Sequence, residues 1–367
     1  ENGTQDADSV IFKAMKDEID KRMTSEINGQ HPMFLDYYVR RQATTKIVSS
    51  LGSCLKYEPE GVKNSGLVQV IAGNRMQTSY SGNTLGRPFL LPDELCYYHL
   101  RSELSQRTAI QFRNATDWLV NNQSEVRADS LPEWLELPGR TVIESSALDG
   151  WQEDAELLKV LANKLSEVLG TYSEFTSSRV EIEQKYIDCY RVTSEGLKMR
   201  MPFRQIKLLL FADLPMANGT KLKVIDGYGS ICEVSDLPPT DSLIAFVKRT
   251  AEFNITQCKA TRCDDLEYMG PVLYEGSAAN VFLQENTYNK TLSTYIHTHF
   301  NLNKREYDNT YQKIGKKVVS NHISLTQLSN DSVFDGHRLL RYRHYDADGV
   351  RPQTVELIRD GILLRQL

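Results

Sequence analysis

The sequence predicts an α+β fold in which antiparallel sheets pack against long amphipathic helices. Two blocks rich in β-branched and aromatic residues alternate apolar with polar side chains, a pattern typical of antiparallel strands with one buried face. Segments with helical periodicity precede, separate and follow these blocks. The regular alternation of strand and helix that a parallel sheet requires is missing, which argues against a doubly wound α/β fold.

The first expected element is an amphipathic helix over residues 10–23, where polar side chains lie opposite one apolar stripe. The stripe consists of Val10, Ile11, Ala14, Met15, Ile19 and Met23. From residue 34 the sequence is rich in β-branched and tyrosine residues and is interrupted by Gly and Pro. We expect three antiparallel strands here, with turns near Gly61 and Gly73.

Two long helices are expected between the β-rich blocks. The first follows Pro92, because proline suits an early helix position and the acids after it suit the first turn, and it runs to about residue 120. A brief strand is expected over residues 141–145. The second helix covers residues 151–172 and should bury a leucine face. That face consists of Leu157, Leu158, Leu161, Leu165 and Leu169.

The second β-rich block, residues 178–233, predicts a meandering antiparallel sheet with a turn at residues 194–196. A helix should follow over residues 238–251, with the side chain of Thr240 or Asp241 as its cap.

Near its C-terminal end the chain should form a turn at residues 346–349, because Asp and Gly favour turns. A hairpin should then pair residues 354–358 with residues 362–364 over Asp360-Gly361. The polar stretch 286–309 has no clear periodicity, so no element is predicted there.

The length of 367 residues suggests two domains. We expect a helix-and-sheet domain over residues 1–175 and a β-rich domain over residues 176–367. The net charge of −5 argues against a dedicated nucleic-acid binder. No apolar run approaches the roughly 20 residues that span a bilayer. The polar start after Glu1 favours an exported, periplasmic protein, with a cytoplasmic location as the alternative.

The stretch 270–284 is the strongest candidate for a functional site. A short apolar run there meets one carboxylate, Glu275, which a glycine and a small-residue helix start follow. Glu275 should therefore lie at the end of a strand or in the first turn of a helix. Two interpretations stay open: a functional carboxylate, or a capping residue that stabilises the helix N-terminus through its charge.

Several catalytic and cofactor motifs are missing from the sequence, among them HExxH, a nucleophile elbow, a Walker A loop and GxGxxG. The pair His297 and His299 offers two imidazoles from one face of an extended segment, but such a pair is more often a polar surface patch, and no third ligand lies nearby in the sequence. Residues 227–230 come nearest to an elbow, and a β-turn is the simpler interpretation. The cluster of Asp346, Asp348 and Gly349 suits a cation site or a plain turn.

Three stretches of the chain, taken together, resemble the TldD/PmbA family, also known as modulators of DNA gyrase. They are YRVTSEGLKMRMP at 190–202, MGPVLYEGSAANVF at 269–282 and HYDADGVRPQTVELIRDGIL at 344–363. The segment MFLDYYVRRQATTKIVSSLGSCL at 33–55 is similar to an exported, degenerate branch of that family. The resemblance covers most of the chain and implies a two-part TldD/PmbA-like architecture, in which the C-terminal domain, 176–367, is short relative to the family.

The resemblance also implies a site. Active members of the family carry an H-E-x-x-x-H motif that binds zinc, and they work with a partner subunit that lacks the motif. Carried over to this sequence, the first histidine falls on Tyr274, the glutamate on Glu275 and the last histidine on Ala279. Tyrosine is a poor zinc ligand at neutral pH and alanine cannot ligate. We therefore expect no metal cofactor and retain Glu275 alone as a catalytic candidate.

The leading hypothesis is a pseudoenzyme: a non-catalytic peptide-binding or partner subunit of a peptide-processing protease. Its partners would be a peptide or protein substrate and a TldD-like subunit in a homo- or hetero-oligomer, with the β-rich blocks accepting an extended peptide by strand addition. The alternative is a metal-dependent peptidase whose ligands come from His297, His299 or a segment outside this chain. A gyrase-linked regulator rests on the family's older name only, and the acidic balance counts against nucleic acid as a partner.

Overall fold

The structure is a computed structural model, and it describes residues 7–27, 29–74, 77–79, 86–121, 139–216, 219–259, 267, 269–285, 313–339 and 343–365. It confirms the predicted α+β class, with helices and mainly antiparallel sheets. The chain divides into two compact units. The first comprises Glu1–Ala260 and Val333–Arg341, and the second comprises Thr261–Ser332 and Tyr342–Leu367.

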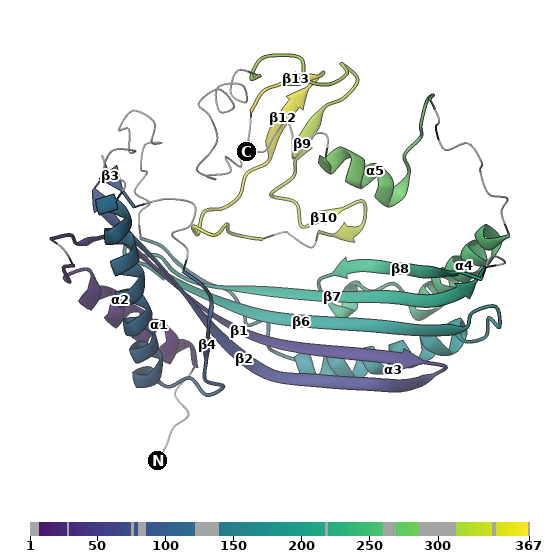
Figure 1. Cartoon of the computed structure of the whole chain (residues 1–367), viewed down its shortest axis with the longest axis horizontal. Coiled ribbons are helices and arrows are strands. Elements are labelled where there is room, and N and C mark those ends of the chain that lie inside the picture. The colour runs from purple at the N-terminus through teal and green to yellow at the C-terminus, as the bar shows by residue number, and fades with distance from the viewer. Residues whose placement is uncertain are drawn as a thin grey trace. The chain divides into compact units, whose positions relative to one another are not determined.

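A large twisted sheet forms the framework of the first unit (Figure 1). Four long strands lie in the order β2-β1-β6-β7, and each is antiparallel to its neighbour. Their bounds are β1 Pro32–Ser50, β2 Ser53–Asn74, β6 Ser177–Thr193 and β7 Lys198–Pro215. The sheet also contains β3 (Gln77–Thr78), β4 (Phe89–Leu91), β5 (Thr141–Ile143) and β8 (Lys221–Ile231). Because β1 pairs with β6, one sheet spans the boundary that the sequence predicts at residue 175, and the two units are not divided there.

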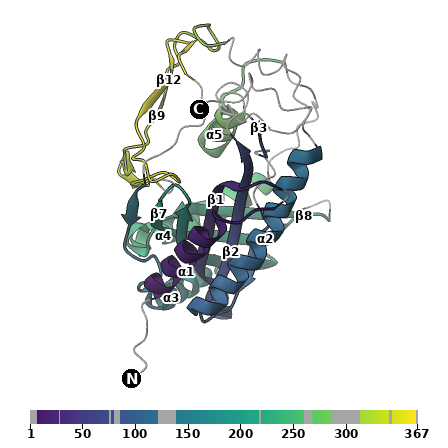
Figure 2. The ribbon, with the colours of Figure 1, turned by 90° about the vertical axis from the view of Figure 1, so that its left-hand side faces the viewer.

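Helices cover one face of this sheet in two pairs (Figure 2). The first pair is α1 (Ala7–Arg22) and α2 (Tyr97–Asn121), and the second is α3 (Trp151–Leu169) and α4 (Thr240–Cys258). Both pairs pack on alternate residues of the strands: Tyr37 and Ile47 of β1 point to this face, one beneath each pair. Alternation of side chains along a strand gives the sheet one apolar face, as the sequence pattern predicts.

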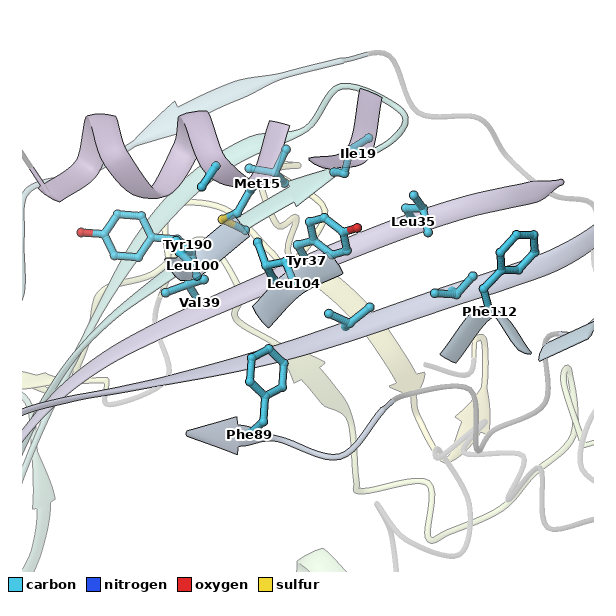
Figure 3. Packing of buried hydrophobic residues seen from close by; sticks show 14 of the residues in the cluster. Met15, Ile19, Leu35, Tyr37, Val39, Phe89, Leu100, Leu104, Phe112 and Tyr190 are labelled. Atoms are coloured by element: carbon cyan, nitrogen blue, oxygen red, sulfur yellow. The ribbon is translucent and has the colours of Figure 1, made fainter. Parts of the chain in front are cut away.

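The cluster beneath the first helix pair shows how tightly this face is packed (Figure 3). Met15 of α1 and Leu104 of α2 are completely buried against Tyr37 of β1. The Tyr37 hydroxyl lies 2.7 Å from the hydroxyl of Thr108, so the polar end of this buried ring has a partner. Burial of large side chains of this kind contributes about 1.5–3 kcal/mol each.

The opposite face of the sheet holds a buried ion pair. Asp36 and Tyr38 alternate with the helix-facing residues of β1, so their side chains point to the other face. The guanidinium of Arg191, on β6, donates to both carboxylate oxygens of Asp36 at distances of 2.7–3.1 Å. Arg191 also lies over the ring of Tyr38, 5.0 Å from its centroid. Asp36 is fully buried and Arg191 is 7% exposed.

The β1–β2 connection differs from the prediction. The strands meet at a two-residue turn, Leu51-Gly52, in which both residues have positive φ (50° and 79°). This conformation matches the twist of a hairpin, but leucine is not a usual residue for it. The turn predicted at Gly61 is wrong, because Gly61 lies inside β2 at a shift in register. The turn near Gly73 is confirmed by the pairing of β2 with β3.

The helices lie where they are predicted, but α2 begins at Tyr97, five residues after Pro92, and α4 continues to Cys258, seven residues beyond the predicted end. Two further details differ. Leu158, Leu165 and Leu169 of α3 are buried, but Leu157 is 60% exposed. The predicted cap of α4 is wrong: Pro239 occupies the N-cap position, Thr240 is the first helical residue, and no side chain caps the helix. Among the described helices, none combines the length and apolarity that a membrane span needs.

The second unit contains a helix and a small antiparallel sheet. The helix is α5 (Gly276–Leu283), and the sheet has the order β13-β12-β9. Its strands are β9 (Leu325–Gln327), β12 (Val355–Arg359) and β13 (Ile362–Leu363). The predicted hairpin over Asp360-Gly361 is confirmed, and both turn residues have positive φ (48° and 81°). Leu357, Ile358 and Leu363 form the core of this sheet.

A short hairpin, β10 (Val333–Phe334) with β11 (His337–Arg338), belongs to the first unit. The guanidinium of Arg338 forms ion pairs with Glu233, at 3.2 Å, and with Asp236, at 3.7 Å. Glu233 also pairs with Arg204 of β7 at 3.0 Å. These four charges hold the hairpin beside the segment that joins β8 to α4.

Candidate functional site

Glu275 lies at the N-cap of α5, with extended backbone angles (φ −125°, ψ 157°). The predicted position at a helix start is therefore correct. The residues before it, 271–275, form no strand. The Glu275 side chain makes no capping hydrogen bond and is exposed to solvent. Gly276 follows with φ 55°, a conformation that favours glycine.

The two positions that flank Glu275 in the family motif hold an aromatic ring and a methyl group. The ring of Tyr274 stacks on Phe282, with centroids 4.6 Å apart and planes inclined by 21°. Ala279, one turn into α5, is half-buried and has no ligand atom. The geometry at the helix start thus offers a single carboxylate beside a stacked aromatic pair.

The surface around α5 is strongly apolar within the described part of the second unit. Several large side chains of this segment are exposed: Met269, Val272, Leu273, Val281 and Leu283. Scattered apolar residues on a surface are ordinary, but a group of this size on one short segment is typical of contact surfaces. The segment therefore has the character of an interaction surface with one carboxylate at the start of its helix.

Other residues considered for metal or nucleophile chemistry have separate outcomes. His297 and His299 lie outside the described residues. Among the residues that the structure describes, no group of three or more His, Cys, Asp or Glu side chains is arranged to hold a metal ion. Gly227, considered for an elbow or a turn, lies within β8, where a Cβ atom would come 2.6 Å from the carbonyl oxygen of Leu208. Both the elbow and the turn are therefore excluded at Gly227.

The turn predicted at residues 346–349 is confirmed. The Oδ1 atom of Asp346 accepts hydrogen bonds from the backbone N–H groups of Asp348 and Val350, each at 2.9 Å. Gly349 has φ 71°, which closes the turn. The carboxylate of Asp346 is thus used to fix the loop, and the turn brings the residues on its two sides together.

A pocket of about 500 Å³ lies at this turn, entirely within the second unit. It is lined by Ser329, Asn330, Arg343, His344, Tyr345, Arg351, Pro352 and Gln353. The guanidinium carbon of Arg351 lies 5.7 Å from the centroid of the Tyr345 ring, so the two sides of the turn contact each other. In the sequence, Arg343 belongs to a short basic cluster with Arg338 and Arg341, which a solvated face also explains, so nothing there indicates a pocket.

The residues with clearly raised pKa values lie elsewhere, in the first unit. Burial is the main cause for Tyr37, Tyr38, Tyr186 and Tyr190, and each has a pKa well above the ordinary tyrosine value. Hydrogen bonds to carboxylates raise the pKa of three of them further: Tyr38 to Asp36, Tyr186 to Asp154 and Tyr190 to Asp8. These tyrosines belong to the packed sheet, and their raised pKa values keep the hydroxyl groups protonated at neutral pH.

The fold is shared with solved structures. A proposed modulator of DNA gyrase from Thermotoga maritima superposes with a TM-score of 0.58 at 14% identity, covering 97% of this chain and 70% of that one. A second proposed gyrase modulator, from Bacteroides thetaiotaomicron, gives 0.57 at 11% identity and covers 99% and 72%. TldE from Thermococcus kodakarensis gives 0.50 at 12% identity and covers 96% and 69%. No protein-family model and no curated protein matches the sequence.

At these identities the comparisons establish the fold. The similarity to the TldD/PmbA family that the sequence predicts is thus confirmed at the level of the fold, across nearly the whole chain. The activity of the chain has to be argued from its own residues.

Proposed function

We propose that this protein is a non-catalytic peptide-binding or partner subunit of a peptide-processing protease, built on the TldD/PmbA-like fold. The observation that supports the proposal most directly is the occupancy of the motif positions beside Glu275. Tyr274 is engaged in a ring stack with Phe282, and Ala279 has only a methyl group. A catalytic zinc ion is usually held by three protein ligands, such as two histidines and a glutamate, and neither Tyr274 nor Ala279 supplies a suitable one.

Strand addition is the proposed mode of peptide binding. Within the described residues, β8 pairs only with β7 and β9 pairs only with β12. Each strand therefore has a second edge on which an extended peptide can form backbone hydrogen bonds. The outer edge of β2 differs, because Pro59 and the charged residues Glu58 and Glu60 oppose strand pairing there.

The alternative is a metal-dependent peptidase, and the exposed carboxylate of Glu275 at a helix start is the observation that favours it. Zinc content separates the two functions. The purified protein is incubated with excess zinc, dialysed and measured by plasma mass spectrometry. The partner function predicts far less than one zinc per chain, and the control Glu275→Gln should not change that value. One tightly held zinc per chain, lost in Glu275→Gln or in a His297→Ala variant, would overturn the proposal.

A further inference from the structure

We infer that the pocket at the Asp346 turn binds the carboxylate of a peptide. The inference rests on the proposed function, because it names the chemical group that a bound peptide presents to the second unit. The pocket is a different site from the Glu275 segment, since most of its lining comes from the stretch 344–363. None of the motif residues 274, 275 and 279 lines the pocket.

The charge of the lining is the first argument. Arg343 and Arg351 contribute two guanidinium groups, and His344 contributes an imidazole. None of the residues that line the pocket is acidic. A guanidinium donates two parallel hydrogen bonds to a carboxylate, and such charge-assisted bonds are about twice as strong as neutral ones. Asn330 and Gln353 add amide donors at the same pocket.

The second argument is that the pocket is held in shape. Asp346 lies in the loop between two of the lining segments, and its Oδ1 atom accepts hydrogen bonds from two backbone N–H groups. The Tyr345 ring lies against Arg351, which restricts the positions that the guanidinium can adopt. A cation held in place before binding loses less freedom when the ligand arrives, which favours affinity.

The third argument is the location of the pocket relative to β9. Ser329 lies two residues beyond Gln327, the last residue of β9. An extended chain advances about 3.3 Å per residue, so a peptide added along β9 can place its end in the pocket within two or three residues. The volume of about 500 Å³ accepts one or two peptide residues and falls in the usual range for ligand pockets, roughly 300–1,000 Å³.

A hexapeptide of sequence Ala-Val-Thr-Val-Ala-Ala, labelled with fluorescein at its N-terminus, tests the inference in two forms. One form has a free C-terminal carboxylate and the other a C-terminal amide. Fluorescence anisotropy with the full chain should give a Kd about tenfold lower for the acid form, the scale expected for one charge-assisted contact. The variant Arg351→Gln should remove most of this preference, and Arg351→Lys should restore part of it.

The control is Arg359→Gln. Arg359 lies on β12 in the same unit, outside the pocket, and pairs with Glu356 at the surface. It changes the net charge by the same amount and should keep the preference for the acid form. Circular dichroism checks that each variant is folded, and Arg351 is exposed, so its replacement should not disturb the core.

The outcomes separate the two proposals. Equal binding of acid and amide forms, unchanged in Arg351→Gln, overturns the carboxylate site and leaves peptide binding intact. A preference for the acid form that Arg359→Gln removes as strongly as Arg351→Gln also overturns it, because the effect is then one of overall charge. Failure of both forms to bind overturns the peptide-binding function and this inference with it.

Discussion

The ion pair between Asp36 and Arg191 offers a sharp test of the sheet described above. The change is Arg191→Met, which keeps an unbranched side chain of similar reach and removes the guanidinium. Asp36 is fully buried and accepts three contacts from Arg191 at 2.7–3.1 Å. Without Arg191, its carboxylate stays in the interior with the Tyr38 hydroxyl as a remaining donor.

The expected cost is about 3–5 kcal/mol, the range for removing one partner of a buried pair. Exposed pairs contribute about 0–1 kcal/mol, because water screens them. Lys16 and Asp20 form such a pair on α1, at 2.9 Å, with side chains 67% and 59% exposed. Lys16→Met is therefore the matched control. The double variant Asp36→Leu with Arg191→Met should cost less than Arg191→Met alone, because no charge is then left unpaired.

Urea unfolding followed by far-ultraviolet circular dichroism measures these differences as changes in the free energy of unfolding. The reasoning predicts a clear order: Arg191→Met is the least stable, the double variant is intermediate or close to the original protein, and Lys16→Met is unchanged within error. If Arg191→Met costs no more than Lys16→Met, the ion pair is solvated in the native protein and its assignment as buried is refuted.

Three further outcomes follow from the structure. Leu158→Ala should lower the free energy of unfolding by about 2–5 kcal/mol, because Leu158 is fully buried. Leu157→Ala should change it by less than about 0.5 kcal/mol, because Leu157 is 60% exposed. Equal effects in urea unfolding would contradict the packing of α3. The free energy of unfolding should fall above about pH 10, because burial raises the folded-state pKa of Tyr37, Tyr38, Tyr186 and Tyr190 above the unfolded value. The contribution of each tyrosine is complete below the unfolded pKa. It is lost as pH rises toward the folded pKa, at about 1.4 kcal/mol per pH unit for each group. Urea unfolding at a series of pH values from 8 to about 11 measures this fall, which should be shallower in Tyr190→Phe. A stability that does not change with pH over this range would contradict the prediction. Tyr274→His with Ala279→His should raise the zinc content above that of the original protein, with Tyr274→Phe as the control; no rise would show that these positions do not correspond to the family motif.

Much of the fold follows from the sequence because burial of one face imposes a period on the residues. The apolar stripe of α1 and the alternation along β6 predicted both elements close to their observed bounds. The hairpin at Leu51-Gly52 was missed for a local reason: leucine is rare at positive φ, so nothing marked that position as a turn. Gly61 was the more obvious turn signal, but there the glycine serves a register shift inside β2.

The division into units and the pocket required information that local pattern does not contain. Asp36 and Arg191 are 155 residues apart in sequence, and only the pairing of β1 with β6 brings them together. The pocket is likewise assembled from three separate segments, which meet because the Asp346 carboxylate fixes the turn between two of them. The position of Glu275 at a helix start, in contrast, follows from local sequence, because the glycine and small residues after it specify that start directly.

The tight Leu51-Gly52 connection has an evolutionary consequence for the whole molecule. It joins strands of 19 and 22 residues with no slack, so it sets the alignment of the longest hairpin in the described chain. If the pairing register shifted to accommodate one added residue there, each side chain of β2 would move to the opposite face of the sheet. The polar residues of β2 would then lie under the helices. Insertions and deletions should therefore be tolerated at other loops of this protein long before they are tolerated at this one.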